Sequence, residues 1–295
     1  MKKENKEQWP FYEWETLVIR IDGWLGRNIA MAWAITELAK VRPVKVIASW
    51  PLVFWWNPYI KSVHGLDDRN LYKDVILWND YVEIEPYTDP EFFNNWRNWL
   101  EIVHKQLRYH WLTVWDTPQP CLFLAEHEML NNVLDGQKPI LFQPFWSTTQ
   151  ANGADKSYRS MRPADAQYLA NGLIAKWYTV YVVERPDQPK LNWCICLDTP
   201  DMRFVVSLCA RYPVLGCDSC LHHAAKAFWK QAVVLWSATD AERYGYDTNI
   251  NLREHEMVLH TPLRLGINDF NTDVINQYTN IYSTKFLDKV IALYE

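Results

Sequence analysis

The chain has 295 residues, 49% of them hydrophobic, and a net charge of -5 at neutral pH. This length is sufficient for two domain cores. The acidic balance argues against a broad nucleic-acid-binding face, although it leaves room for a local basic groove. No apolar run approaches the roughly 18 residues that a membrane-spanning helix needs, and the charged start MKKENKEQWPFYEW lacks the apolar core of a secretion signal. We therefore expect a cytoplasmic protein without stable membrane insertion.

The first half of the chain begins with a predicted βαβ unit. The run Thr16 to Ile21 predicts a strand, Ile29 to Val41 a helix with Asn28 as its N-cap, and Val44 to Ala48 a second strand. Such a start implies a parallel sheet. The remainder of this half is less regular and predicts strands at 75–78, 82–84 and 112–115 and helices at 90–109 and 125–134.

Turn-forming residues at 135–139 predict a boundary, after which the pattern of the first half is repeated. The second half predicts strands at 140–145, 178–183, 193–197, 214–217 and 232–236, and helices opened by Pro163, at 199–211 with Thr199 as N-cap, and at 222–228. We therefore predict an α/β fold of two facing, doubly wound Rossmann-like domains with a central cleft. The domains would cover residues 1–136 and 137–283, with a terminal helix at 284–295 that packs back toward the first domain.

The segment Asp218 to Trp236 carries the main functional pattern, a polar turn and a short helix between two apolar runs. At the carboxyl end of a parallel strand, the N–H groups and the dipole of the following helix favour a phosphate. Asp218 and Ser219 lie at the turn, and His223 lies one helical turn later. The pattern is that of a nucleotide-sugar site. In the alternative interpretation, Asp218 and Ser219 only cap the helix and His223 is structural.

Four of the six cysteines lie close in sequence, at Cys194, Cys196, Cys217 and Cys220, and two histidines follow. A zinc site is conceivable, but zinc ribbons usually pair two C-x-x-C knuckles on loops. These cysteines lie in or beside apolar, strand-like runs instead. We therefore favour reduced structural thiols and no bound metal, with a zinc-dependent module as the weaker alternative.

The segment from Asp218 to Leu235 resembles the donor-site pattern of the ADP-heptose:lipopolysaccharide heptosyltransferase family, glycosyltransferase family nine, which runs D-[S/T]-G-x-x-H-x-A-A-A-x-G-K-P-V-V-x-L. The resemblance covers both halves and is clearest from Pro139 to about Leu252. It implies the GT-B architecture, with the donor bound mainly by the second domain and the acceptor by the first. It also implies transfer of a sugar, with inversion, from a nucleotide-diphosphate sugar to a hydroxyl acceptor, with no further cofactor.

The resemblance implies donor-binding roles for residues that come mainly from the carboxyl ends of second-half strands. They are Ser147, Thr148 and Thr149 near the diphosphate, Lys156 and Arg159 against the leaving phosphate, Glu184 toward the ribose hydroxyls, Thr239, and the motif residues Asp218, Ser219, Cys220 and His223. Fixed cations and helix N–H groups stabilise the charge that grows on the diphosphate as the glycosyl bond breaks. For Lys156 and Arg159, an ordinary solvated charge is the alternative.

One departure from the family pattern concerns catalysis. The family shows G-x-x-G-D after its first strand, with the aspartate as general base, whereas this chain has Gly23-Trp24-Leu25-Gly26-Arg27. An arginine stays protonated and cannot accept a proton. We therefore consider Asp22 a candidate base and Arg27 a candidate for binding an anionic acceptor or phosphate. The alternative is an impaired nucleotide-sugar-binding or assembly protein that retains the fold.

A second departure is the scarcity of glycine, with 9 Gly beside 17 Trp. Trp24, Trp146, Trp177 and Trp229 stand where backbone geometry or the family pattern favours glycine. Trp177 and Trp229 follow predicted helices, a position where left-handed backbone is common. Our hypothesis is that some of these codons are read as glycine in the source, as with a reassigned UGA. The alternative is a true aromatic surface, for which sugar stacking is one use.

Overall fold

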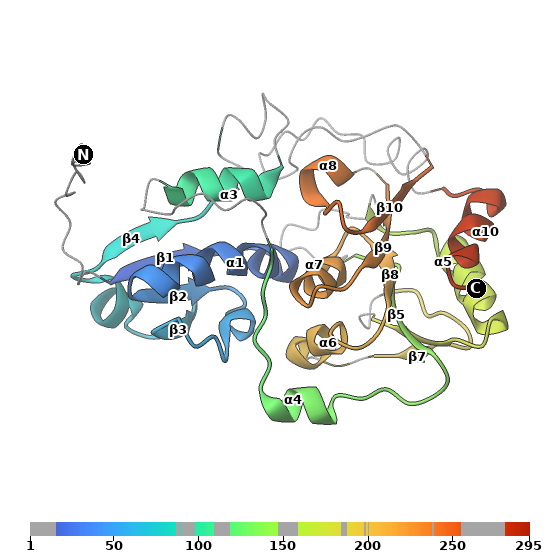
Figure 1. The fold of residues 1–295 in the computed structure, drawn as a ribbon, viewed down its shortest axis with the longest axis horizontal. Helices are drawn as coiled ribbons and strands as arrows, with labels where there is room; N and C mark the ends of the chain where they lie inside the picture. Colours follow the sequence, from blue (N-terminus) through green and yellow to red (C-terminus); the bar gives the residue numbers. More distant parts are fainter. Residues whose placement is uncertain are drawn as a thin grey trace, which may run out of the picture.

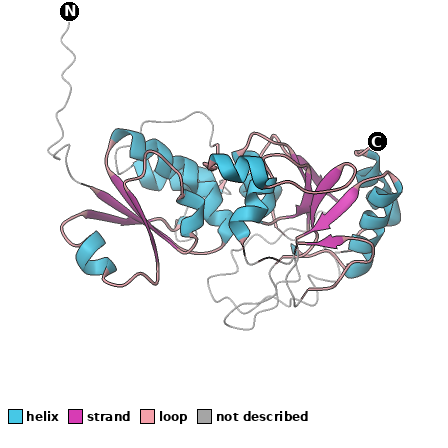
Figure 2. Cartoon of the chain, turned by 90° about the horizontal axis from the view of Figure 1, so that it is seen from below, coloured by secondary structure: helices cyan, strands magenta, loops and turns pink. Residues whose placement is uncertain are grey.

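The computed structural model describes residues 16–86, 89, 98–108, 119–146, 159–183, 188–197, 199, 201–237, 239–254 and 281–295. Within these residues the strands form two sheets, one from each half of the chain, and helices fill the space between them (Figures 1 and 2). Every strand pairs with its neighbours in parallel. The predicted architecture of two parallel α/β domains is thus confirmed. None of the helices in the described ranges combines the length and apolarity needed to cross a bilayer.

The first lobe contains a four-stranded sheet in the order β3-β2-β1-β4. Its elements are β1 (Leu17–Ile21), α1 (Leu25–Val41), β2 (Val44–Ala48), the 3-10 helix η1 (Pro51–Phe54), β3 (Ser62–Gly65), the π-helix η2 (Tyr72–Ile76), β4 (Asp80–Glu83) and α3 (Trp99–Arg108). The strand predicted at 75–78 was wrong, because this segment forms the end of η2 and the turn that follows it. The strand predicted at 112–115 lies outside the described residues.

The second lobe contains a six-stranded sheet in the order β10-β9-β8-β5-β6-β7. Its strands are β5 (Pro139–Gln143), β6 (Thr179–Val182), β7 (Ile195–Cys196), β8 (Val214–Cys217), β9 (Ala232–Trp236) and β10 (Ile250–Arg253). The helices of this half are α5 (Pro163–Ala175), α6 (Met202–Leu208), α7 (Cys220–Ala227), α8 (Ala241–Tyr244) and α10 (Thr284–Ala292), and α4 (Glu126–Asn131), from the end of the first half, packs against α6. The central position of β8 places the motif that follows it at the middle of the sheet edge.

Two predicted helix starts were wrong. The first helix begins at Leu25, with Trp24 at the N-cap, and Asn28 lies inside its first turn, where its amide donates to the Trp24 carbonyl. Helix α6 begins after Asp201, whose carboxylate accepts hydrogen bonds from two N–H groups of the first turn. Thr199 is not the N-cap, because its hydroxyl accepts a hydrogen bond from the N–H of Asp201, which lies before the helix.

The terminal helix α10 packs on the second lobe, against α5 (Figure 1). Leu287 and Val290 join the apolar core on the outer face of the second sheet, and the Tyr168 hydroxyl donates to Asp288 Oδ1 at 2.7 Å. The prediction that this helix packs toward the first domain was therefore wrong. Its apolar stripe matches the outer face of α5, which the sequence pattern does not distinguish from other apolar faces.

The two lobes meet where α1 packs against α7. Leu25 and Ile29 of α1 share one buried apolar cluster with Leu221 and Ala224 of α7. Gly26 permits this approach, because a Cβ built on it would lie 2.8 Å from the His223 ring. The glycine that opens α1 therefore sets the spacing between the lobes at the motif helix.

A buried arginine adds a second tie between the lobes. Arg203 of α6 bonds to Glu128 of α4 at 2.6 Å and also donates to the carbonyl of Leu52 in the first lobe at 3.0 Å. Burial opposes ionisation of Glu128, but the Arg203 hydrogen bond, the Ala125 N–H and the Arg203 charge together outweigh it and lower the pKa of that carboxyl. Charge and apolar burial thus hold the lobes together on either side of the motif.

Candidate functional site

The candidate site begins where β8 ends. Asp218 follows the strand, Ser219 occupies the N-cap position, and α7 starts at Cys220. The Ser219 side chain makes no capping hydrogen bond, so its hydroxyl does not satisfy the N–H groups at the helix start. The N–H of Leu221 donates to Gln143 Oε1 of the neighbouring strand β5 at 3.4 Å. The turn is therefore tied to the sheet while the helix terminus keeps its positive end.

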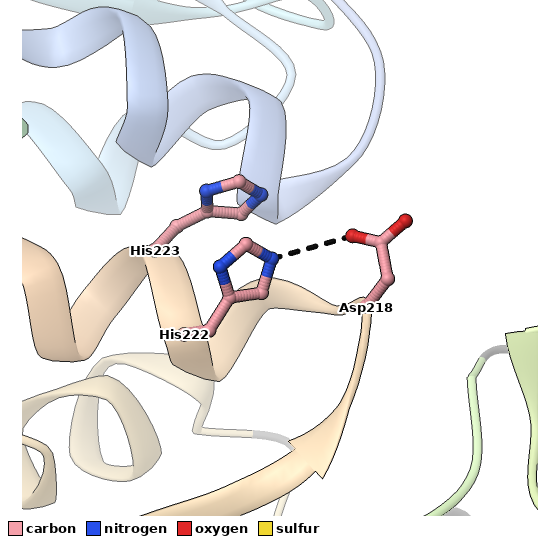
Figure 3. Close-up of side chains that lie close together, drawn as sticks. All are labelled: Asp218, His222 and His223. Carbon is pink, nitrogen blue, oxygen red and sulfur yellow. Dashed lines mark hydrogen bonds and ion pairs between the residues drawn. The ribbon is translucent and has the colours of Figure 1, made fainter. Parts of the chain in front are cut away.

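Asp218 is the charged centre of the site. It is 3% exposed and lies 3.3 Å from Arg159 Nη1 through one oxygen and 3.3 Å from His222 Nε2 through the other. Figure 3 shows His222 reaching back over the turn to this carboxylate. Burial opposes ionisation, but the Arg159 guanidinium and the His222 hydrogen bond outweigh it, and the pKa of Asp218 is held well below its ordinary value. The carboxylate is therefore ionised and fixes both partners.

His223 lies beside His222 and turns toward the first lobe (Figure 3). Burial, with the nearby His222, lowers the pKa of His223 well below its ordinary value, so the ring is neutral. Burial raises the pKa of Tyr246 well above its ordinary value, and its hydroxyl lies 2.8 Å from His223 Nδ1. In the tautomer that accepts from this phenol at Nδ1, Nε2 carries the N–H, on the Gly26 side of the ring. His223 is thus a neutral ring that Tyr246 holds at the meeting point of the lobes.

Arg159 carries the positive charge of the site. Its guanidinium carbon lies 4.7 Å from the ring centre of Trp146 and 5.9 Å from that of Tyr244. Trp146 in turn meets Trp24 of the first lobe, with ring centres 5.3 Å apart. Two aromatic rings of the second lobe therefore flank the cation beside Asp218, and one of them contacts the first lobe.

The corresponding edge of the first lobe has a different charge arrangement. Arg27 is buried, and its Nη1 lies 3.3 Å from Asp22 and 3.0 Å from Glu85, while Nη2 donates to the Ile84 carbonyl. Two carboxylates thus already neutralise Arg27, which weakens the hypothesis that it binds an anionic acceptor or phosphate. Sequence reasoning missed Glu85, although its position directly after the predicted strand 82–84 was a usable signal.

The structure brings together Asp218, Arg159 and His223 as predicted, and it adds His222, which the spacing of four residues from Asp218 could have shown. Cys220 faces away toward the sheet, with its Sγ 3.7 Å from the Gln143 amide, so its role is packing at the turn. Thr239 follows β9 and is buried, and its hydroxyl has no hydrogen-bond partner among the described residues. The other predicted donor residues, Ser147, Thr148, Thr149, Lys156 and Glu184, lie outside the described residues.

Three side chains of the site lie close enough together to ligate a metal ion, but the contacts that Asp218 already makes do not favour one. Among the described residues, Asp218, His222 and His223 bring one donor atom each within 4.8 Å of one another. Asp218 already binds Arg159 and His222, however, and the Arg159 charge repels a cation. The cluster therefore fits an anion-facing network better than a metal centre.

The cysteines do not form a joint zinc site. Cys194 and Cys196 belong to the edge strand β7 and its flank, whereas Cys217 ends β8. Strands β5 and β6 separate the two pairs, which at the usual strand spacing is roughly 14 Å. All six cysteines are thiols, and burial raises the pKa of Cys121 to about 11. The geometry supports the interpretation of reduced structural thiols.

No protein-family model and no curated protein matches the sequence. Solved structures do match. A family 9 glycosyl transferase from Veillonella parvula has a TM-score of 0.67 and 10% identity over 95% of this chain and 98% of its own. The iron-containing dodecameric glycosyltransferase TibC from enterotoxigenic E. coli has a TM-score of 0.67 and 14% identity over 95% of this chain and 78% of its own.

The E. coli ADP-heptose lipopolysaccharide heptosyltransferase II has a TM-score of 0.54 and 13% identity over 95% of this chain and 99% of its own. The chain thus has the GT-B fold of glycosyltransferases. At the level of fold, the likeness that the residue pattern indicated is confirmed.

Proposed function

We propose that this protein is a glycosyltransferase that moves a sugar from a nucleotide-diphosphate sugar to a hydroxyl acceptor with inversion. The observation that carries the proposal is the ion pair between Arg159 and the buried carboxylate of Asp218 at the start of α7, on a fold shared with glycosyltransferases. Two solved neighbours hold related ligands: TibC was solved with ADP-D-beta-D-heptose and the E. coli heptosyltransferase WaaC with ADP. These complexes support a nucleotide diphosphate as the donor-side ligand.

The second lobe supplies the groups that a diphosphate needs. Arg159 provides a fixed cation, α7 directs its N-terminus at the same place, and neutral His223 provides an N–H donor. In the low dielectric of a buried site, such groups stabilise the growing charge on the leaving diphosphate without reorganising. Asp218 acts as a positioning residue, because it holds Arg159 and His222 in place. Protein groups supply the positive charge, and the proposal therefore requires no metal.

The first lobe supplies the base. Asp22 follows β1 and lies on the loop that leads to Gly26, the residue that contacts His223. The acceptor hydroxyl gives its proton to the Asp22 carboxylate, and its oxygen attacks the anomeric carbon on the face opposite the diphosphate. The bond between that carbon and the diphosphate oxygen breaks, and its electron pair stays on the diphosphate. Arg27 holds Asp22 in position, and Glu85 is the second carboxylate available for the same role.

The second candidate function is binding of a nucleotide sugar without turnover. It is favoured by the arginine at the family's base position and by the Trp24–Trp146 contact, which lies beside Arg159. This candidate predicts tight nucleotide binding and no release of nucleotide diphosphate in the presence of any acceptor.

Binding of ADP, UDP and GDP and of their sugars, measured by thermal shift and calorimetry, tests the donor site. A ligand that binds only the folded state raises the melting temperature with its concentration. Arg159→Ala should weaken binding of the preferred nucleotide diphosphate by roughly 10- to 100-fold, as expected for a charge-assisted contact. It should also cost stability, on the order of 3–5 kcal/mol, because Asp218 stays buried.

Arg162→Ala is the matched control, since Arg162 lies three residues away and pairs with Asp165 on α5. It should leave nucleotide binding unchanged. Binding of no nucleotide diphosphate to the folded wild-type protein, or equal binding by Arg159→Ala, would overturn the proposed function.

A further inference from the structure

Left-handed backbone in this chain is occupied mainly by tryptophan. Among the described residues, seven other than glycine have φ between 42° and 68°, and five of them are tryptophans. They are Trp56 (φ 61°), Trp78 (φ 68°), Trp177 (φ 67°), Trp193 (φ 64°) and Trp229 (φ 59°). A Cβ disfavours this region, which glycine occupies freely and which bulky residues rarely enter.

Two of the five end helices in the arrangement that favours glycine most. Trp177 follows the C-cap of α5, its N–H donates to the Ile174 carbonyl, and the next N–H donates to the Leu173 carbonyl. Trp229 has the same pair of bonds after α7. This is the Schellman motif, whose left-handed residue is usually glycine.

Two more lie in type II turns. Trp55, before Trp56, has φ -60° and ψ 147°, and Leu77, before Trp78, has φ -57° and ψ 131°. In each turn the fourth N–H donates to the first carbonyl, at 3.3 and 3.1 Å. Type II turns require positive φ at their third residue and therefore favour glycine there.

The side chains at these positions contribute little to the fold. All five are exposed, from 59% at Trp56 to 91% at Trp78. By contrast, Trp236 is 1% exposed and its indole N–H donates to Asn251, and the indole N–H of Trp50 donates to the Gly23 carbonyl. These five tryptophans therefore differ from Trp236 and Trp50: their side chains are exposed, and they stand where the backbone favours a residue without Cβ.

We infer that positions 56, 78, 177, 193 and 229 are glycine in the protein as its own host makes it. The codon UGA is read as tryptophan in some genetic codes and as glycine in others, so one codon accounts for all five. The inference explains the low glycine content, the shared left-handed backbone and the exposure together. It is independent of the proposed function, because it rests on backbone geometry.

The residue identities can be determined on the natural protein. Peptide mass spectrometry of the protein isolated from its host should show the mass of glycine at the five positions and of tryptophan at Trp236 and Trp50. The gene should carry UGA at the five positions and UGG at those two. Tryptophan masses in the native peptides, or UGG codons at the five positions, would overturn the inference.

A synthetic gene tests the physical basis. Replacing the five tryptophans by glycine should raise the melting temperature by on the order of 10 °C, since each change relieves left-handed strain. Replacing them by alanine should give no such rise, because alanine keeps the Cβ. Trp55→Gly is the matched single control, because Trp55 is exposed beside Trp56 but has ordinary φ, and it should not stabilise. Equal effects of glycine and alanine would contradict the strain argument.

Discussion

At one edge of each sheet a strand leads into a helix, α1 in the first lobe and α7 in the second, and an arginine lies beside the turn. The carboxylates that pair with this arginine differ between the two edges. In the second lobe, Arg159 pairs with Asp218 at the positive end of a helix. In the first lobe, Arg27 meets two carboxylates, Asp22 and Glu85. The end of α7 therefore adds positive charge at the second edge, whereas carboxylates outnumber Arg27 at the first. From this difference we propose that the diphosphate binds at the second lobe and that a carboxylate of the first lobe accepts the proton.

The largest expected effect concerns the two first-lobe carboxylates. Asp22→Asn should lower kcat by roughly 10²- to 10⁴-fold, the usual contribution of a general base, with nucleotide binding unchanged. Glu85→Gln should have a much smaller effect if Glu85 only holds Arg27. The measurement is release of nucleotide diphosphate in the presence of acceptor.

Asp80→Asn is the matched control, because Asp80 begins β4, at the opposite end of the strand from Glu85, and pairs with Arg42. It should leave kcat unaltered. A larger loss for Glu85→Gln than for Asp22→Asn would transfer the base role to Glu85. If wild-type protein binds the nucleotide but shows no turnover, the binding-protein alternative holds instead.

The sequence predicted those parts of the molecule that depend on neighbours in the chain. The strands at 44–48, 214–217 and 232–236 were predicted with the observed bounds, because they are apolar runs between turn formers. Asp218 and His223 could be predicted because they follow such a strand. The Arg27–Glu85 pair could not, because it joins residues 58 positions apart through strand pairing that the pattern does not encode. For the same reason the packing of α10 on α5 was missed.

The contact between the edges can be disturbed at Gly26. In Gly26→Ala the new Cβ would lie 2.8 Å from the His223 ring and 3.3 Å from the Cys220 Cα. Overpacking of this kind costs about 1–3 kcal/mol, measured by denaturant unfolding, and should also weaken nucleotide binding by moving His223. Gly172→Ala is the control, since it meets Ile291 between α5 and α10. It should reduce stability while leaving nucleotide affinity intact, and equal binding losses would refute the role given to Gly26.

A smaller effect is expected from the aromatic residues that enclose Arg159. Trp146→Gly removes the ring that lies against both Arg159 and Trp24, and it should raise nucleotide-diphosphate affinity a few-fold by calorimetry. Trp55→Gly, far from these contacts in sequence and exposed, should not change affinity. A loss of affinity in Trp146→Gly would mean that the ring itself contacts the ligand.

The smallest expected effect is the pH dependence of stability that arises from the titratable groups of the second-lobe edge. The pKa of His223 lies below its ordinary value of 6.5 in the folded protein, so below that pH the unfolded chain takes up a proton that the folded protein does not. The free energy of unfolding should therefore fall as pH decreases from 6.5, by up to about 1.4 kcal/mol per pH unit. The depressed pKa of Asp218 adds a second loss only below about pH 4, where the unfolded carboxyl becomes protonated.

Denaturant unfolding at pH 7 and 5.5 isolates the first window. In His223→Gln the loss of stability between these pH values should shrink by about 1 kcal/mol, because the residue that titrates only in the unfolded chain is gone. The same measurement on His64→Gln, which removes a partly exposed histidine on β3 of the first lobe, 3.3 Å from Asp68, separates the effect of His223 from the loss of any one histidine. If His223→Gln keeps the full wild-type slope, the ring is not the neutral group that the second-lobe edge requires.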